Sequence, residues 1–538
     1  MMTDEYMKTI KITILVGLLT ALTTGCDSFL DVTPDSRSNL NSTDKVYEML
    51  VSCYPSKFTA PIFEHRTDNV MDNGPRFEES SNIHVSENYH WKANTGPAGE
   101  DNTLGLWNEC YSTIANVNIL LDGINKLGDG SELQAAKGEA LVCRAYSHFL
   151  MVNTFAPAYS PTTAKSALGI PYATKVESKI GTTYKRESLQ ANYDSIMMDI
   201  SRGLPLIDDA KLKVPAYHFN SQAAYAFAAK VALYAEQWDK AIQYATQALG
   251  PNPAPTLRSY KELNKANTPE EWGRLFISEN MPCNYLIVPM YSSWFRDIIA
   301  ARYGVHNSIM SSQILLSAGP WGSGLPLLSK GIYNFASSAA ENNFLARYYE
   351  IFEYTDIVAG IGYVHVVDVP FGSDMTLLFR AEAYVLTKQY DLAAKDLNMW
   401  YNAKGAQVNL TAAEIAEYYE EAAAKNHPVA KPLHPKFELE PGLQTNLIQA
   451  VLHARRIESV HTGQRWEDIK RYGIEITHNV ARGSDITLTT DDPRRAIEIP
   501  NDVITAGLPA NRPDHNPVSA VSTAILQQIQ PFVPRTNK

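Results

Sequence analysis

Cysteine and positive charge are both scarce in this chain. Five cysteines occur among 538 residues, and no two of them form a C-x-x-C pair. The spacing therefore gives no support to a zinc site or a thioredoxin-like redox centre. Lysine and arginine total 47 against 58 aspartates and glutamates, which gives a formal net charge of −11. Because neutralising phosphates requires a basic face, this balance argues against a general nucleic-acid-binding protein.

Motifs of the common catalytic chemistries are also missing. The sequence contains neither the H-E-x-x-H motif of zinc proteases nor the G-x-x-x-x-G-K-[ST] phosphate loop. Ser323 lies between two glycines but does not form the G-x-S-x-G nucleophile elbow. Glu417, Glu420 and Glu421 share one predicted helix, whereas a glycosidase requires two carboxylates that face each other across a cleft. We predict a protein without catalytic residues, metal ligands or cofactor.

Long hydrophobic runs are absent as well, and the clearest apolar stretch is short. Residues 12–24 are uncharged and mostly apolar, whereas a membrane-spanning helix requires about 20 residues. Lys8 and Lys11 precede the stretch, and it leads into Cys26 through a sequence that resembles a bacterial lipoprotein cleavage box. We predict that residues 1–25 are a lipoprotein signal peptide and that lipid on Cys26 anchors the mature chain to a membrane. An ordinary cleaved signal is the alternative.

Helical periodicity is the main pattern in the rest of the chain. Residues 132–152 carry two apolar stripes at spacings of three and four, which predicts a helix packed on more than one side. Residues 221–250 match the alanine spacing of a tetratricopeptide repeat, and residues 376–405 repeat it less closely. Because one repeat cannot bury its apolar face alone, the copies must stack. We predict a mostly α, tetratricopeptide-like helical scaffold (an α–α superhelix) over about 110–250 and 371–475.

Between the repeats, long stretches lack this periodicity. Residues 56–110 and 254–370 are rich in glycine, proline, serine, asparagine and aromatics, and the prolines of 480–538 predict a loop-rich carboxy-terminal region. Two short apolar runs inside the larger insertion predict strands, at Tyr285–Met290 and Ile361–Val369. We predict a single domain over 26–538 in which large loop-rich insertions interrupt the helical scaffold.

Six segments in chain order resemble one family of bacterial lipoproteins. They are Cys26–Pro34 (CDSFLDVTP), Lys137–Ala140 (KGEA) with Arg144–Tyr146, Gly169–Tyr172 (GIPY), Arg380–Ala383 (RAEA), Arg455–Glu458 (RRIE) and Gly463–Gly473 (GQRWEDIKRYG). Together these segments resemble the SusD/RagB-like outer-membrane nutrient-binding lipoproteins. Ala454 and Thr462 depart from the pattern, because the family usually has glutamate at both positions.

The resemblance implies binding and not chemistry. SusD-like proteins lie at the cell surface as lids on SusC-like TonB-dependent transporters. We therefore expect a surface-exposed, lipid-anchored outer-membrane protein that captures an oligosaccharide or polysaccharide and delivers it to such a transporter. Peptide capture by the same kind of lipoprotein remains an alternative, and a surface-attached glycoside hydrolase is a weaker one. The charged motif residues are predicted to form a buried or half-buried ion network, made by Arg455, Arg456, Glu458, Arg465, Asp468 and Arg471.

Candidate ligand contacts must come from physical chemistry, because the family's ligand residues vary between members. A sugar ring has an apolar face and a rim of hydroxyls, which suits flat aromatic side chains and a few polar groups. Such aromatics should lie on loops outside the repeats. We predict ligand contacts at Tyr89, Trp91, Asn73, Tyr291, Trp294, Arg296 and Trp321. The alternative for each aromatic is a core residue that fixes an irregular loop, and we predict packing for Trp107, Trp238, Trp400 and Trp466.

Overall fold

The structure is a computed structural model, and it describes residues 40–77, 82–177, 184–300, 302–334 and 341–513. The predicted signal peptide over residues 1–25 and the predicted lipidation site Cys26 lie outside these residues. Among the described helices, none is long and apolar enough to cross a membrane.

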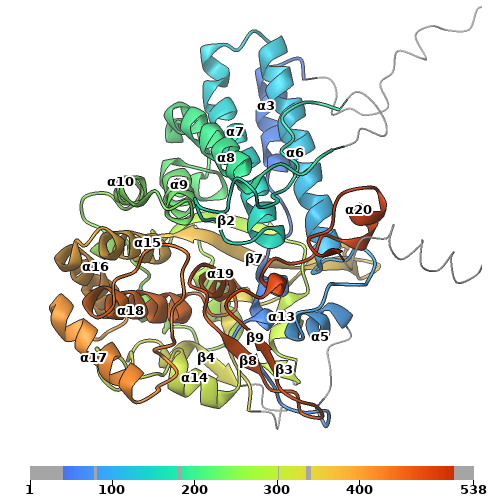
Figure 1. The fold of residues 1–538 in the computed structure, drawn as a ribbon. Coiled ribbons are helices and arrows are strands. Elements are labelled where there is room, and N and C mark those ends of the chain that lie inside the picture. Colours follow the sequence, from blue (N-terminus) through green and yellow to red (C-terminus); the bar gives the residue numbers. More distant parts are fainter. Residues whose placement is uncertain (1–39, 78–81, 178–183, 301, 335–340, 514–538) are drawn as a thin grey trace, which may run out of the picture.

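Helices make up most of the regular structure and pack in two connected groups (Figure 1). The longer helices are α6 (Thr103–Lys126), α7 (Gln134–Phe155), α8 (Leu189–Gly203), α9 (Ser221–Tyr234), α10 (Trp238–Leu249), α15 (Ser373–Leu386), α16 (Tyr390–Ala403), α17 (Ala412–Ala424), α18 (Leu443–Glu458) and α19 (Gln464–Arg471). Sequential helices pair, as α6 with α7, α9 with α10 and α15 with α16, and contacts between α10 and α15 join the groups. The predicted mostly α, repeat-like scaffold is confirmed.

Short helices and strands occupy the regions before, between and after the repeats. The helices are α3 (Thr43–Leu50), α4 (Ala60–Phe63), α5 (Ile83–Tyr89), α11 (Tyr260–Leu263), α12 (Pro269–Phe276), α13 (Trp294–Ile298), α14 (Asn307–Gln313) and α20 (Asn501–Thr505). The strands are β1 (Met71–Asp72), β2 (Asn284–Met290), β3 (Tyr303–Gly304), β4 (Ile332–Asn334), β5 (Asn343–Leu345), β6 (Ile351–Asp356), β7 (Ile361–Gly372), β8 (Ile476–His478) and β9 (Ile486–Leu488). The predicted loop-rich insertions are therefore confirmed, and they carry small helices and sheets.

The α9–α10 pair shows how the sequence builds one repeat. The Asn220 side chain accepts a hydrogen bond from the Ala223 amide and caps the first turn of α9. Alanines recur along both helices and are buried, which lets the helices approach closely. Gly250 ends α10 at a φ of 68°, a left-handed conformation that glycine adopts without a Cβ penalty.

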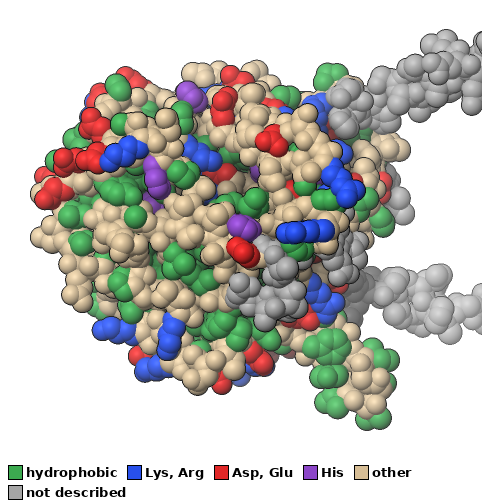
Figure 2. Space-filling view, turned by 90° about the horizontal axis from the view of Figure 1, so that it is seen from below, with side chains coloured by type: hydrophobic (Ala, Val, Ile, Leu, Met, Phe, Trp, Pro, Cys, Tyr) green, Lys and Arg blue, Asp and Glu red, His purple; other side chains and the backbone are tan. Residues whose placement is uncertain are grey.

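The insertion 254–370 contributes a three-stranded antiparallel sheet in the order β2-β7-β6. Both strands predicted from the sequence are present, because β2 covers the first apolar run and β7 covers the second. Figure 1 shows this sheet crossing the middle of the molecule, where β2 and β7 contact α9 and β7 contacts α15. The β6–β7 hairpin ends in a turn where Ile357 is 81% and Val358 is 99% exposed. Figure 2 shows hydrophobic side chains gathered on a projection at the lower right of the face it draws.

The six charged residues predicted to form one ion network are buried, but the structure divides them among three clusters. Arg456 and Arg465 pair with Asp68, Glu458 pairs with Lys404, and the remaining three cluster with Glu382 where three helices meet. Arg455 of α18 pairs with Glu382 of α15 and, at 2.5 Å, with Asp468 of α19. Arg471 of α19 pairs with the same Glu382 at 2.8 Å. Burial alone favours the neutral acid, but Arg471 and Arg455 hold the pKa of Glu382 below its usual value. Such a network fixes geometry, since removing one partner leaves an uncompensated buried charge.

The four described cysteines, Cys53, Cys110, Cys143 and Cys283, are free and buried. Burial raises the pKa of the Cys283 thiol to about 11, so the thiol form predominates at neutral pH. In the described residues, no group of three or more histidine, cysteine, aspartate or glutamate side chains has a geometry that could hold a metal ion.

Candidate functional site

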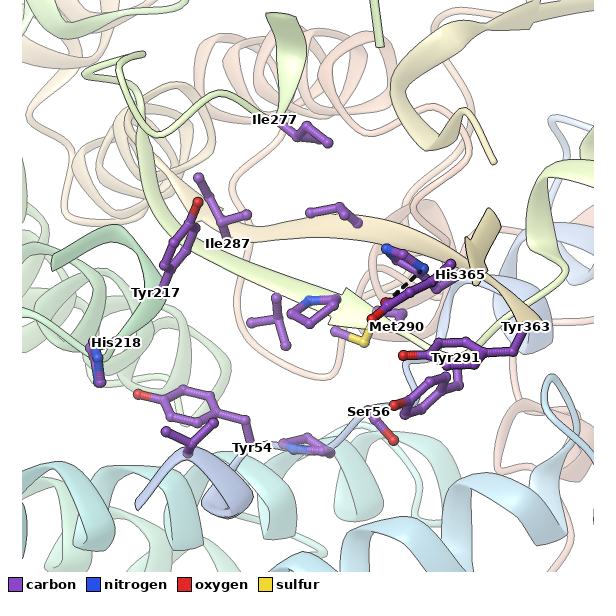
Figure 3. A pocket seen from close by; sticks show the side chains of 16 residues that line it. Tyr54, Ser56, Tyr217, His218, Ile277, Ile287, Met290, Tyr291, Tyr363 and His365 are labelled. Carbon is purple, nitrogen blue, oxygen red and sulfur yellow. Dashed lines mark ion pairs between the residues drawn. The ribbon is translucent and has the colours of Figure 1, made fainter. Parts of the chain in front are cut away.

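A cleft of about 600 Å³ opens beside the β2-β7-β6 sheet (Figure 3). Its lining comes from segments far apart in the sequence: residues 51–56 after α3, residues 217–218 before α9, Ile277 after α12, strand β2 with Tyr291, and the β6–β7 hairpin. The backbone amide of Tyr291 donates a hydrogen bond to the Ser56 carbonyl at 2.8 Å, which fixes one wall against the other. Five separate parts of the chain must therefore fold together before the cleft exists.

The floor of the cleft is apolar and belongs to the sheet. Val288 and Met290 of β2 and Val367 of β7 line it, and the first two are nearly inaccessible to solvent. Pro289 lies between them on β2, which pairs with β7 on one side and forms the edge of the sheet. A proline has no amide hydrogen to donate, so it is accommodated on an edge strand and discourages further strand pairing there. The floor is thus left open to a ligand.

Tyrosine side chains form the two ends of the cleft. At one end, the rings of Tyr291 and Tyr363 meet edge to face, with centroids 4.9 Å apart and planes at 62°. At the other end lie Tyr54 and Tyr217 (Figure 3). Tyr291 and Tyr217 keep 43% and 48% of their surface exposed. Exposed tyrosines combine a flat apolar face with a hydroxyl, which is the chemistry that suits a ligand with apolar faces and polar rims.

Polar groups at the rim are few and mostly engaged. Glu353 and His365 face each other across the β6–β7 pair, with Oε2 and Nδ1 3.8 Å apart. Partial burial lowers the pKa of His365 below its usual value. His218 lies 2.8 Å from Glu139, and this hydrogen bond raises the pKa of the imidazole. The site therefore offers hydrogen-bonding groups around an apolar floor, and Glu353 is the one carboxylate among its described lining residues.

The structure places one of the predicted ligand contacts in this cleft, and that residue is Tyr291. Tyr89 and Trp91 are 0% and 2% exposed, and both rings stack on His478 at 4.3 Å. Trp294 is 1% exposed, and its indole nitrogen donates to the His461 carbonyl at 3.0 Å. These three rings present no open face to a ligand in this conformation.

The remaining predicted contacts also lie outside the cleft. Trp321 is 6% exposed and its ring lies 5.1 Å from that of His453. The Asn73 amide donates to the Asn342 side chain at 2.9 Å. Arg296 is exposed, and its guanidinium makes a two-pronged pair with Glu350 at 2.6 and 2.8 Å. The tryptophans predicted to pack do so, since Trp107, Trp400 and Trp466 are buried and Trp238 packs against the core.

Sequence reasoning missed most of the cleft. Tyr363 and His365 are two residues apart on β7, and Glu353 lies opposite Tyr363 in the strand register. Alternate side chains of a β-strand point to the same face. The sequence Gly362–Val366 could therefore have placed Tyr363 and His365 on one face, if a β-hairpin had been assumed. Tyr54 and Tyr217 carried no comparable signal, because nothing local indicates that they face each other.

The fold and cleft together define a class: a helical-repeat protein that carries a ligand-sized cleft on an inserted sheet. Residues 28–233 match the family described as "Starch-binding associating with outer membrane", of the SusD-like type. A comparison with curated proteins finds no match at a significant level.

Solved structures of the same class match almost the whole chain. A SusD superfamily protein from Bacteroides thetaiotaomicron is 19% identical, covers 88% of this chain and 100% of its own, and gives a TM-score of 0.56. A SusD-like carbohydrate-binding protein from Bacteroides vulgatus is 17% identical over 83% of this chain and 89% of its own, with a TM-score of 0.53. A SusD-like protein from Bacteroides fragilis is 15% identical over 90% of this chain and 99% of its own, with a TM-score of 0.59. The resemblance to SusD-like proteins is therefore supported by the family model over residues 28–233, and the solved structures show the same fold over most of the chain.

Proposed function

We propose that this chain is a non-enzymatic binding protein that captures an oligosaccharide or polysaccharide in the cleft beside the β2-β7-β6 sheet. The observation that carries the proposal is the tyrosine pair in the cleft, in which exposed Tyr291 meets half-buried Tyr363 beside an apolar floor. The volume of about 600 Å³ lies within the usual range of small-ligand sites, roughly 300–1,000 Å³. Tyr291 is the contact that the sequence and the cleft share, and it is the centre of the proposed site.

The setting of this capture is proposed from the family likeness and the amino terminus. We infer that residues 1–25 are removed as a signal peptide, that lipid on Cys26 anchors the chain in the outer membrane, and that residues 26–538 act as one unit. The captured glycan would pass to a SusC-like TonB-dependent transporter. The family description, which names the outer membrane, and the short apolar stretch before Cys26 support this proposal.

The lining of the cleft also bears on the alternatives. A glycosidase requires two opposed carboxylates, and Glu353 has no second carboxylate opposite it among the described lining residues. The rings and the apolar floor would equally suit an extended peptide, so a binding experiment must include peptides. Glycan capture is favoured because a Bacteroides vulgatus protein of the same fold is described as carbohydrate-binding.

The test is a glycan and peptide panel measured by affinity electrophoresis and calorimetry. We expect the Tyr291→Ala variant to bind the best glycan about tenfold or more weakly, because a stacking face is lost. The Tyr354→Ala variant is the matched control. Tyr354 is 56% exposed in the β6–β7 hairpin, but it follows Glu353 on β6 and therefore projects from the face of the strand that is turned away from the cleft.

Three outcomes would overturn the proposal. If Tyr291→Ala binds as tightly as the wild type while Tyr354→Ala binds weakly, the ligand lies on the other face of the hairpin. If oligosaccharide is released from the polymer during incubation, the protein is a hydrolase. Retention of peptides without retention of any glycan would favour peptide capture.

A further inference from the structure

The ionised groups around the cleft are predominantly acidic. Glu353 lines the cleft directly. Three further glutamates hydrogen-bond to lining side chains: Glu109 accepts from the Ser56 amide and hydroxyl at 2.8 Å, Glu139 accepts from the Tyr54 hydroxyl and contacts His218, and Glu279 hydrogen-bonds to Tyr217. Among the residues that the structure describes, none of those lining the cleft is a lysine or an arginine.

The lining histidines offset only one of these carboxylates. Protonated His218 pairs with Glu139 at 2.8 Å, and that pair carries no net charge. His365 lies near Glu353, but its partial burial favours the neutral imidazole. Among the described lining residues, a ligand therefore meets Glu353 without a matching cation.

The excess of acidic over basic side chains is specific to this cleft and is not found in every cavity that the structure describes. A second cavity of about 340 Å³, beside the ends of α9 and α19, is lined by Lys436, Lys470, Arg471 and Arg495 as well as by acids. Figure 2 also shows lysine, arginine, aspartate and glutamate side chains scattered over the face it draws. Arg274 and Arg347 also line a small adjoining cavity that shares Ile277 and Val367 with the cleft. In the described part of the chain, basic side chains therefore line neighbouring hollows and not the cleft itself.

We propose that the cleft selects an uncharged saccharide and rejects glycans that carry carboxylate, sulfate or phosphate groups. The inference rests on the proposed function and names the ligand class of that same site. An anionic group brought close to Glu353 is repelled, and the repulsion is stronger near a low-dielectric surface than in bulk water. An unpaired carboxylate in a binding site weakens the binding of anionic ligands and has little effect on the affinity for neutral ones. Its main effect is therefore on specificity.

The test uses polysaccharides in matched sets. Each neutral polymer is paired with its carboxymethyl derivative, and the hydroxyethyl derivative of the same polymer controls for bulk without charge. At about 0.01 M salt we expect the carboxymethyl form to bind about tenfold or more weakly than the hydroxyethyl form. This difference in affinity between the two forms should become smaller at about 1 M salt, where the Debye screening length is only about 3 Å.

A charge-reversal variant locates the effect. Glu353→Lys should reduce the ratio of the affinities for the hydroxyethyl and carboxymethyl forms by about tenfold. Glu417→Lys changes the net charge by the same amount on an exposed position of α17, and we expect it to leave this ratio unchanged. An equal reduction by both variants would assign the effect to the overall charge of −11 and overturn the inference.

The outcomes separate this inference from the proposed function. If the best ligand is an anionic glycan and Tyr291→Ala still weakens its binding, the cleft is the glycan site but the ligand class is wrong. If no polymer in any form binds, the proposed function fails and the inference fails with it. A neutral ligand whose carboxymethyl form binds equally well overturns the inference alone.

Discussion

Aromatic residues of the loop-rich insertions that were predicted to contact a ligand have opposite fates. Tyr89 and Trp91 are buried against His478, and we call these three residues the buried ring stack. Tyr291 keeps 43% of its surface exposed in the cleft. All three predicted contacts occur in polar, irregular sequence. The local composition that made them candidates is therefore the same, and the difference comes from what the distant chain places over them.

The cover over the buried ring stack comes from the far end of the chain. His478 belongs to β8, almost 400 residues after Tyr89. The Tyr89 hydroxyl donates to the Asn479 carbonyl at 2.9 Å, and the Trp91 indole donates to the Arg66 carbonyl at 2.9 Å. Each polar atom of the rings is thus satisfied inside the protein, as buried tyrosines and tryptophans require. A buried aromatic residue whose polar atoms are hydrogen-bonded inside the protein stabilises its loop and has no exposed face with which to bind a ligand.

The largest effect that tests this comparison is expected at Trp91. Trp91→Ala removes a ring that is 2% exposed and should lower the free energy of unfolding by about 3–5 kcal/mol. Tyr291→Ala in the cleft should change it by less, by about 1 kcal/mol, because 43% of the surface of Tyr291 is already exposed. Urea unfolding of both variants makes the measurement. A Trp91→Ala variant that unfolds like the wild type but loses its ligand would show that this ring faces the ligand.

A second, smaller effect concerns pH and another buried ring. His453 contacts Trp321 and hydrogen-bonds with Tyr419 and Ser317, and burial lowers its pKa to about 3. Since a histidine in the unfolded chain has a pKa of about 6.5, the unfolded state binds more protons as the pH falls. Stability is therefore lost from about pH 6.5 downwards, by at most about 1.4 kcal/mol per pH unit for this group.

The measurement is the unfolding free energy against pH for the wild type and for His453→Gln. Other buried histidines contribute a background common to both proteins, so the difference between the two curves isolates His453. We expect the variant to be less stable at neutral pH, where its packing is poorer, and the gap to shrink as the pH falls. A gap that stays constant from about pH 7 to about pH 4 would contradict the assignment of a neutral, buried imidazole.

The scaffold could be predicted from sequence because its signals are local. Alanine spacing indicated the α9–α10 pair, and apolar runs indicated strands β2 and β7. In both cases the pattern lies within one short segment of the chain. The charged residues of the ion clusters were instead identified through the family resemblance, and Glu382, the partner of Arg455, lies 73 residues before it in the sequence.

The cleft could not be predicted in the same way, because it is a relation between distant segments. Tyr54 and Tyr217 are more than 150 residues apart and carry no shared periodicity, yet both line the same cleft. Burial is equally non-local: Trp294 lies in a short helix of an irregular segment, and its indole is satisfied by the carbonyl of His461. Composition therefore indicated that aromatics matter in the insertions, and the three-dimensional fold determines which of them remain open.

The smallest expected effect sharpens the comparison at the cleft itself. His218 is half-buried, and its hydrogen bond to Glu139 raises its pKa, which is the opposite of the shift at His453. A raised pKa in the folded state stabilises the protein fully below the unfolded pKa of about 6.5, and this stabilisation is lost as the pH rises through the folded pKa. We expect less than about 1 kcal/mol, because water screens the partly exposed pair. His218→Asn should therefore be destabilised relative to the wild type at about pH 6 and should approach it above about pH 8. A difference that grows with rising pH would mean that His218 is held neutral, and the cleft would then resemble the protein interior in its electrostatics.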